Sequence, residues 1–301
     1  MKPLTVLFLL LVSAYACTDT TTASEMQEET VEQATRNEPY GGLALYTLRD
    51  TMAKNPRGVL QTVADMGYRN IEAAGYADGK FYGMAPAAFQ SFLDSIGLTP
   101  MSSHHGDVTL ENADRHIADA VAAGFTYFVI PIPPMGHFRY DEATRTLGMS
   151  EDVAEVSRIL NEIADKCHAA GIRCLYHNHD FEFRPNAAGV VPMDYFVENS
   201  DPEKLNFQMD LYWVTRAGGD PVAYFEKYPG RWYAWHVKDM DDQQRFAPVG
   251  QGSIDFARIL DQAEQAGMKT YFVEQDATFD GQQPIEAVQI SHAALAEIGF
   301  E

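Results

Sequence analysis

The sequence predicts an α/β fold, a single (β/α)8 TIM barrel, in a chain of 301 residues. From residue 41 onward, a short β-rich run, a polar loop and an amphipathic helical stretch follow one another repeatedly. Eight such units in about 260 residues match the size of this barrel. The competing arrangement is an open, doubly wound sheet. That fold usually carries a GxGxxG turn after its first strand, whereas the first run here ends in YTLRD.

The elements follow from local patterns, taken in chain order. We expect strands in the runs rich in β-branched and aromatic residues: 42–50, 68–75, 98–106, 126–134, 172–181, 205–213, 232–240 and 269–277. Between them, apolar residues at three- and four-residue spacing predict helices, for example at 58–67, 87–97, 153–171 and 256–269. Glycines stand where left-handed helix C-caps are expected: Gly67, Gly97, Gly124, Gly171 and Gly267.

The N-terminal segment is typical of an exported protein. An apolar run from Leu4 to Val12 is too short to span a bilayer, and small residues precede Cys17. We expect residues 1–17 to be a signal peptide. Its AYAC ending resembles a lipobox, which would leave Cys17 as a lipidated N-terminus; the alternative is ordinary cleavage after Ala-Tyr-Ala. Residues 18–40, rich in Thr, Glu and Gln, predict a disordered linker, and residues 41–301 the barrel domain. We therefore expect a periplasmic or cell-surface lipoprotein.

The net charge limits which partners the chain can bind. The formal net charge of -21 disfavours nucleic acid, and it disfavours strongly anionic substrates without a local basic pocket. Apart from a lipid anchor, nothing points to a membrane.

Cys167 and Cys174 are the cysteines beyond the leader, and their apolar surroundings favour buried free thiols.

Polar side chains end the last four predicted strands. The fifth ends in YHNHDFEF (176–183), the sixth supplies Asp210, the seventh His236 and Lys238, and the eighth Glu274. In a barrel these ends are neighbours on one rim, so inward-facing side chains converge. Carboxylates with an imidazole suit one divalent ion: Mn²⁺, Mg²⁺, Co²⁺ or Zn²⁺.

The chain resembles the xylose isomerase-like TIM-barrel superfamily, often labelled sugar phosphate isomerases/epimerases, and within it secreted Bacteroidetes-type members. The resemblance spans residues 41–300 through LALYTLRD, GYRNIEAAG, SSHHG, YHNHDFEF, HVKDMD, PVGQGSIDF and FVEQD. It implies one divalent metal held by side chains of strands five to eight, with Asp210, His236 and Glu274 as ligands.

The ligand from strand five is open, because no glutamate stands where epimerases of the superfamily carry one. Alternation along the strand places His177 and His179 on one face. Either His177 replaces that glutamate, or the strand bends and Glu182 returns as the ligand. We favour Glu182, since an oxygen-rich set suits hard divalent ions. Where many relatives read Asp-x-x-His, this chain reads Asp-Leu-Tyr-Trp, and Trp213 could serve as a sugar-stacking wall.

The other candidates concern proton transfer and substrate binding. His177 and His179 can act as acid or base near neutral pH, and Lys238, two residues after His236, could lose a proton or polarise a carbonyl. Arg49, Glu72, His104 and Trp213 are candidate substrate-binding residues at the mouth.

These parts predict proton abstraction next to a carbonyl, of the sugar isomerase/epimerase type, on a small carbohydrate. Phosphorylated sugars are scarce outside the cytoplasm, so we expect a non-phosphorylated keto-sugar. Gly250 and Gly252 are the nearest approach to a phosphate-binding loop. The alternatives are a lyase or hydratase of 3-keto-sugars or 3-keto-glycosides, which the resemblance suggests, and a non-catalytic carbohydrate-binding barrel.

Overall fold

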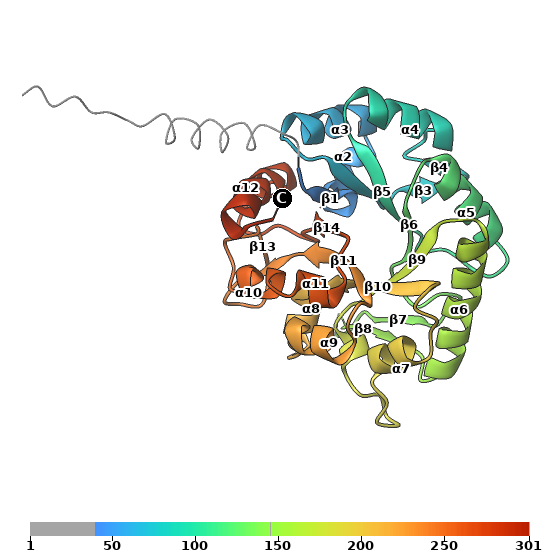
Figure 1. Cartoon of the computed structure of the whole chain (residues 1–301). Helices are drawn as coiled ribbons and strands as arrows, with labels where there is room; N and C mark the ends of the chain where they lie inside the picture. The colour runs from blue at the N-terminus through green and yellow to red at the C-terminus, as the bar shows by residue number, and fades with distance from the viewer. Residues whose placement is uncertain (1–39, 145, 301) are drawn as a thin grey trace, which may run out of the picture. The chain divides into compact units, whose positions relative to one another are not determined.

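The computed structural model describes residues 40–144 and 146–300, which form a closed barrel of parallel strands (Figure 1). Around the barrel the strand order is β1, β2, β5, β6, β9, β10, β11 and β14, with β14 pairing back to β1. Their bounds are Gly42–Ala44, Asn70–Ala73, Thr99–His104, Tyr127–Ile130, Arg173–His177, Leu205–Asp210, Trp232–Val237 and Thr270–Val273. Each of the eight predicted runs contains one of these strands, so the predicted fold class is confirmed.

Helices surround the barrel (Figure 1). In chain order they are η1 (Leu45–Leu48), α2 (Arg49–Met52), α3 (Pro56–Asp65), α4 (Pro86–Ser95), α5 (Ala113–Ala122), α6 (Val153–Ala169), η2 (Phe181–Phe183), α7 (Pro192–Glu198), α8 (Leu211–Arg216), α9 (Pro221–Lys227), α10 (Phe256–Leu260), α11 (Ala263–Ala266) and α12 (Pro284–Ile298). The five glycines predicted to follow helices all have positive φ, between 77° and 99°. None of the helices in the described residues is both long and apolar enough to cross a membrane.

The predicted strands run too far at their carboxyl ends. The first turns into η1 after Ala44, and the fifth stops at His177 and not at 181. The mouth also carries three small antiparallel hairpins: β3 (Tyr76–Ala77) with β4 (Lys80–Phe81), β7 (Phe138–Asp141) with β8 (Thr146–Met149), and β12 (Asp239–Met240) with β13 (Phe246–Ala247).

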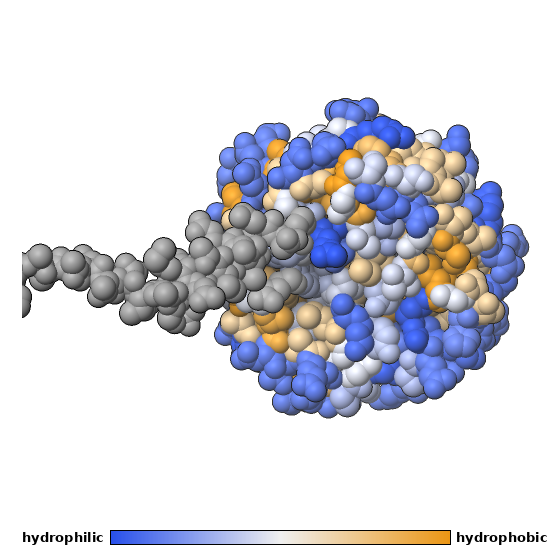
Figure 2. All heavy atoms as spheres, turned by 45° about the horizontal axis from the view of Figure 1, so that its top comes forward, coloured by the Kyte–Doolittle hydropathy of each residue, from blue (hydrophilic) through white to orange (hydrophobic). Residues whose placement is uncertain are grey.

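Two hydrophobic clusters stabilise the barrel. The large one lies between strands and helices, and the small one contains residues from five of the barrel strands: Ala44, Tyr127, Val129, Leu175, Ala234 and Phe272. Its members alternate along the strands with side chains of the large cluster, as expected for a filled barrel interior. On the face drawn in Figure 2, hydrophilic residues surround separate, smaller groups of hydrophobic residues.

Cys167 and Cys174 are free and buried, as predicted. The predicted signal peptide (1–17), including Cys17, and almost all of the predicted linker (18–40) lie outside the described residues.

Candidate active site

Three of the predicted metal ligands come together at the carboxyl ends of β10, β11 and β14. His236 Nδ1 lies 2.8 Å from Glu274 Oε2 and 3.7 Å from Asp210 Oδ2. Donor atoms of the three side chains all lie within 4.8 Å of one another, and all three residues are buried. Asp210 Oδ1 accepts a hydrogen bond from the Trp213 backbone N–H, 3.0 Å away, which fixes the carboxylate. The set combines two carboxylates with an imidazole and fits a divalent cation.

Glu182, the fourth predicted ligand, lies apart from these three. Its Oε1 accepts a hydrogen bond from the Tyr176 hydroxyl at 2.7 Å, and its Oε2 accepts one from the His179 backbone N–H at 2.9 Å. Tyr176 is on the helix-facing side of β9, where the centroid of its ring lies 5.4 Å from that of Phe196 of α7. The chain turns into η2 after Asp180, so Glu182 bends toward the outer layer and not into the barrel. Burial raises the pKa of Glu182 to about 8.

β9 instead contributes His177 to the donor cluster. We use this name for the two overlapping groups of possible metal ligands, whose members are Asp210, Glu274, His104, His177 and His236. Ligand atoms of His104, His177 and His236 also lie within 4.8 Å of one another, so His236 belongs to both groups. The rings of His177 and His236 have centroids 4.6 Å apart. Alternation along β9 therefore points His177 into the barrel and Tyr176 out of it. This orientation agrees with the alternative in which His177 takes the place of the epimerase glutamate.

Gln208 connects the cluster and was not identified from the sequence. Its Nε2 donates to Glu72 Oε2 at 2.6 Å, which turns its Oε1 toward His104 Nε2 (2.9 Å) and His177 Nδ1 (3.1 Å). An amide oxygen only accepts, so Nδ1 of His177 carries the proton and Nε2 keeps its lone pair. Its position could have identified it as a site residue, because Gln208 precedes Asp210 by two residues and so lies on the same face of the strand.

Lys238 lies at the centre of three carboxylates. Its Nζ is 2.8 Å from Asp210 Oδ2, 2.6 Å from Glu274 Oε2 and 2.9 Å from Asp276 Oδ1. Burial opposes the ammonium, but these carboxylates outweigh it and hold the pKa of Lys238 well above its usual range. Lys238 is therefore a buried cation whose charge these three carboxylates balance. Asp276, two residues beyond Glu274, is a further site residue that the sequence analysis missed.

The histidines differ in charge. Burial opposes the protonated form of His236, but Glu274 and Glu72 outweigh it and hold its pKa well above the usual range. Burial and the neighbouring cation-forming groups hold the pKa of His177 well below that range, and burial with Lys238 lowers the pKa of His179 to about 4. At neutral pH the site thus holds neutral His177 and His179 beside an ammonium.

The donor cluster opens into a pocket of about 370 Å³. His179 and Trp213 form one wall, with ring centroids 5.4 Å apart. Among the described residues, His179 Nδ1 and Trp213 Nε1 are buried polar atoms without a hydrogen-bond partner. Unpaired polar atoms beside an aromatic surface suit the hydroxyls and the apolar face of a sugar. The other lining residues include Tyr46, Ala74, His104, Pro131, Ile132, Phe138, Leu147 and Asp276.

The remaining predicted binding residues divide between two places. Glu72 lies at the base of the site, where its Oε1 accepts from His236 Nε2 at 2.6 Å and its Oε2 accepts from Ser102 Oγ at 2.6 Å. His104 lines the pocket, 2.9 Å from Glu72. Arg49 lies outside the cluster, since it donates to the carbonyls of Tyr46 and Asp276 at 3.0 and 2.9 Å and lines a second pocket.

The loop at Gly250 and Gly252 resembled a phosphate-binding loop in the sequence, but its backbone N–H groups are hydrogen-bonded within the protein. The N–H groups of Gly250 and Gly252 donate to Asp239 Oδ2 at 3.0 and 2.9 Å, and that of Ile254 donates to Oδ1 at 3.2 Å. A Cβ on Gly252 would lie 2.2 Å from Asp239 Oδ1, so this glycine allows the close approach. The loop therefore presents no cradle of free N–H groups to a phosphate.

Comparison with known proteins places the chain in a family. The model of the family described as "Xylose isomerase-like TIM barrel" matches residues 60–296. Two structures of sugar phosphate isomerase/epimerase from Parabacteroides distasonis ATCC 8503 are similar. One has 28% identity and a TM-score of 0.71, covering 87% of this chain and 94% of that chain; the other has 27% and 0.73, covering 86% and 98%.

The IOLI protein with a binding zinc atom shares the fold at 14% identity, with a TM-score of 0.65, covering 85% of this chain and 96% of that chain. No curated protein matches the sequence significantly. The matched family model covers most of the barrel and agrees with the strand order and with the resemblance of the motifs at the strand ends. The chain belongs to the xylose isomerase-like TIM barrel family.

Proposed function

We propose that this protein is a divalent-metal-dependent carbohydrate enzyme that abstracts a proton next to a carbonyl of a non-phosphorylated keto-sugar. One observation carries the proposal: the buried group Asp210, His236 and Glu274 reaches, through Glu274, a 370 Å³ pocket that is walled by a neutral histidine and a tryptophan. The similar Parabacteroides structures bear the name sugar phosphate isomerase/epimerase, which supports this class of reaction. The N–H groups of Gly250 and Gly252 already donate to Asp239 and are not free to bind a phosphate, which supports a substrate without phosphate.

The metal would be held by Asp210, His236 and Glu274, with His177, which forms a second donor group with His104 and His236, as a further imidazole donor. A bound Mn²⁺, Mg²⁺, Co²⁺ or Zn²⁺ supplies Lewis-acid polarisation of a carbonyl oxygen. The zinc in the IOLI protein supports a metal at this kind of barrel. Gln208 holds His177 in the tautomer whose Nε2 lone pair faces away from the amide, as a ligand or a base requires.

Proton transfer would fall to His179, with His177 as the second candidate. A pKa of about 4 leaves His179 neutral at pH 7, so its ring can accept a proton. Lys238 would contribute its positive charge, which stabilises negative charge on the enediolate oxygens. Trp213 and His104 would orient the sugar from the pocket walls.

A second candidate is a lyase or hydratase of 3-keto-sugars or 3-keto-glycosides. The observation that favours it is that β9 directs His177, and no glutamate, into the donor cluster. The absence of a glutamate from β9 in this cluster weakens the case for a proton relay between two glutamates, as simple epimerases of the superfamily use. Both candidates begin with the same proton abstraction, and they differ in whether a β-substituent then leaves.

We also propose that the chain is an exported lipoprotein of the secreted Bacteroidetes type. The apolar run and the AYAC sequence before residue 18 support this location. A periplasmic or surface-exposed enzyme would meet glycosides and free sugars more often than sugar phosphates.

The test is reconstitution of the full chain with each of the four metals, followed by elemental analysis and assays on a 3-keto-glucoside and on simple ketoses. Asp210→Ala and His236→Ala should abolish metal binding and activity and leave the circular dichroism spectrum unchanged. Asp242→Ala, at an exposed site, is the control. Full metal occupancy in either site variant would show that the site is misassigned. Turnover of the 3-keto-glucoside alone selects the lyase or hydratase, and stoichiometric metal without any turnover leaves a carbohydrate-binding barrel.

A further inference from the structure

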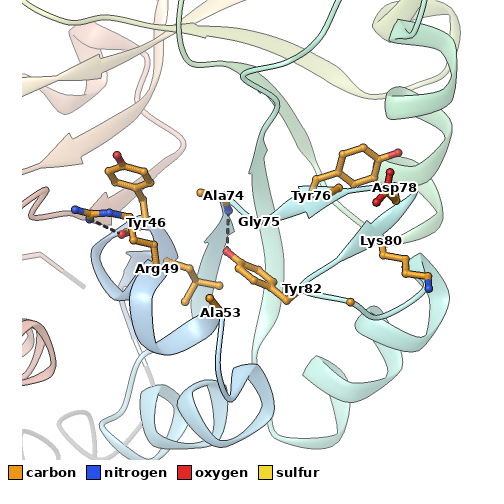
Figure 3. A pocket seen from close by; sticks show the side chains of 12 residues that line it. Tyr46, Arg49, Ala53, Ala74, Gly75, Tyr76, Asp78, Lys80 and Tyr82 are labelled. Carbon is orange, nitrogen blue, oxygen red and sulfur yellow. Dashed lines mark hydrogen bonds between the residues drawn. The ribbon is translucent and has the colours of Figure 1, made fainter. Parts of the chain in front are cut away.

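A second pocket of about 460 Å³ adjoins the candidate active site (Figure 3). Its walls come from the segment after β1, which carries Tyr46 and Arg49, and from the β3–β4 hairpin, which carries Tyr76, Lys80 and Tyr82. Tyr46 and Ala74 line both pockets, so the two cavities are adjacent. Each volume lies within the range of roughly 300–1,000 Å³ that is usual for small-molecule sites. Nothing in the proposed proton abstraction uses the second pocket.

The wall formed by Tyr82 is fixed in place. The Ala74 backbone N–H donates to the Tyr82 hydroxyl at 2.8 Å, as the dashed line in Figure 3 marks. The ring lies directly over Gly75, where a Cβ would come within 2.1 Å of Tyr82 Cε1. Tyr82 itself has a left-handed backbone, with φ of 51°. Such strain in a non-glycine residue often marks a functional position, and here it directs an aromatic ring into a cavity.

The opposite wall is also aromatic and held by hydrogen bonds. The Tyr46 side chain is exposed, and the Arg49 guanidinium carbon lies 4.4 Å from its ring centroid. Arg49 donates to the carbonyls of Tyr46 and Asp276, which links this wall to the loop after β14 in the active site. Because two of its N–H groups are engaged in this way, Arg49 acts chiefly as a brace and less as an anion receptor. Aromatic faces among mixed polar groups suit a neutral sugar ring.

We propose that the second pocket is a subsite for a second sugar ring, so that the substrate is a disaccharide or a glycoside with a sugar aglycone. This inference rests on the proposed function, because the reacting ring would occupy the 370 Å³ pocket. Because the pockets adjoin at Tyr46 and Ala74, one glycosidic linkage passing these residues would join the rings in the two pockets. The subsite would then select extended substrates over free monosaccharides.

The test measures equilibrium binding to full-length protein loaded with Mg²⁺, by isothermal titration and saturation-transfer NMR. The probes are glucose and the disaccharides cellobiose, maltose and trehalose. We expect at least one disaccharide to bind at least 10-fold more tightly than glucose. Ala53→Trp, which places a large ring into the subsite from an exposed position, should reduce that disaccharide to the affinity of glucose and leave glucose unchanged.

Tyr82→Leu, which removes the fixed wall, should have the same selective effect and guards against a failure of the first variant to fold. Tyr140→Ala, an exposed tyrosine outside both pockets, is the matched control and should change neither affinity. Equal binding of glucose and every disaccharide to the wild type would overturn the subsite and leave the proposed function standing. Loss of glucose and disaccharide together in both variants would also overturn it. No binding of any sugar would instead contradict the carbohydrate function on which the subsite depends.

Discussion

Gln208 joins Glu72 to two histidines through a single amide. Because its Nε2 is committed to Glu72 at 2.6 Å, its Oε1 must face His104 and His177. The orientation of one side chain thereby sets the tautomer of His177, a role that partners behind metal ligands commonly have. The consequence can be measured independently of turnover.

We predict that Gln208→Leu lowers divalent-metal affinity about 10- to 100-fold, because His177 is no longer held with its proton on Nδ1. Titration with Zn²⁺ and Mn²⁺ measures the affinity, and ¹⁵N NMR of the imidazoles reports the tautomer. Gln208→Asn, which keeps both the amide donor and the amide acceptor on a shorter side chain, is the conservative comparison. An unchanged tautomer in the leucine variant would contradict the role assigned to the amide.

Glu182 is a second residue whose behaviour follows from its surroundings. Burial raises its pKa to about 8, from 4.5 in a solvated chain. The folded protein therefore retains a proton that the unfolded chain releases above pH 4.5. The stabilisation linked to this proton is complete below pH 4.5 and is lost as pH rises through about 8.

We predict that Glu182→Gln removes this pH dependence. An amide keeps one acceptor for the His179 N–H and cannot ionise, so the variant should resemble the wild type near pH 5. By pH 9 it should be more stable than the wild type by on the order of 3 to 5 kcal/mol. Urea unfolding across this range measures the difference, with exposed Glu226→Gln as the control. Parallel curves for Glu182→Gln and wild type would show that the carboxyl is already ionised at neutral pH.

Among the elements, the loop between β13 and α10 shows how one carboxylate, Asp239 of β12, organises a segment. Asp239 accepts hydrogen bonds from the backbone N–H groups of Met240, Gly250, Gly252 and Ile254, between 2.8 and 3.2 Å. Asp239 follows Lys238 directly, so the loop also supports the residue that neutralises the carboxylates of the site.

We predict that Asp239→Asn destabilises the fold by about 1–3 kcal/mol, since an amide offers one acceptor oxygen where the carboxylate offers two. Hydrogen exchange at Gly250, Gly252 and Ile254 should accelerate. Asp241→Asn, which disturbs a partly exposed ion pair with Arg245, is the comparison and should leave exchange in 250–254 nearly unchanged. Protection that persists in Asp239→Asn would contradict the anchoring role.

For the whole molecule, the acidic surface and the N-terminal segment bear on where the enzyme works. The net charge of -21 keeps such a chain soluble and disfavours anionic partners. The proposed lipid on Cys17 would attach the chain to a membrane.

We predict that wild-type protein expressed in a bacterial host with lipoprotein processing fractionates with membranes and incorporates labelled palmitate. Cys17→Ala should move to the soluble exported fraction without label and keep the same melting temperature, because the barrel does not depend on the anchor. Cys174→Ala, in the barrel, is the control for label specificity. Equal labelling of Cys17→Ala and wild type would contradict the lipobox interpretation and favour cleavage after Ala16.

The sequence by itself determined the fold class, the eight strands and the convergence of Asp210, His236 and Glu274. These depend on local periodicity and on polar residues at strand ends, which a barrel brings to one rim whatever else the chain does. Only the tertiary structure shows that His177, and not Glu182, faces the other donor atoms, because this depends on where the chain after β9 bends. It alone gave the charge of Lys238 and the role of Gln208. Both arise from partners distant in sequence, as in the contact of His236 with Glu72 across 164 residues, and electrostatic environments of that kind leave no local pattern.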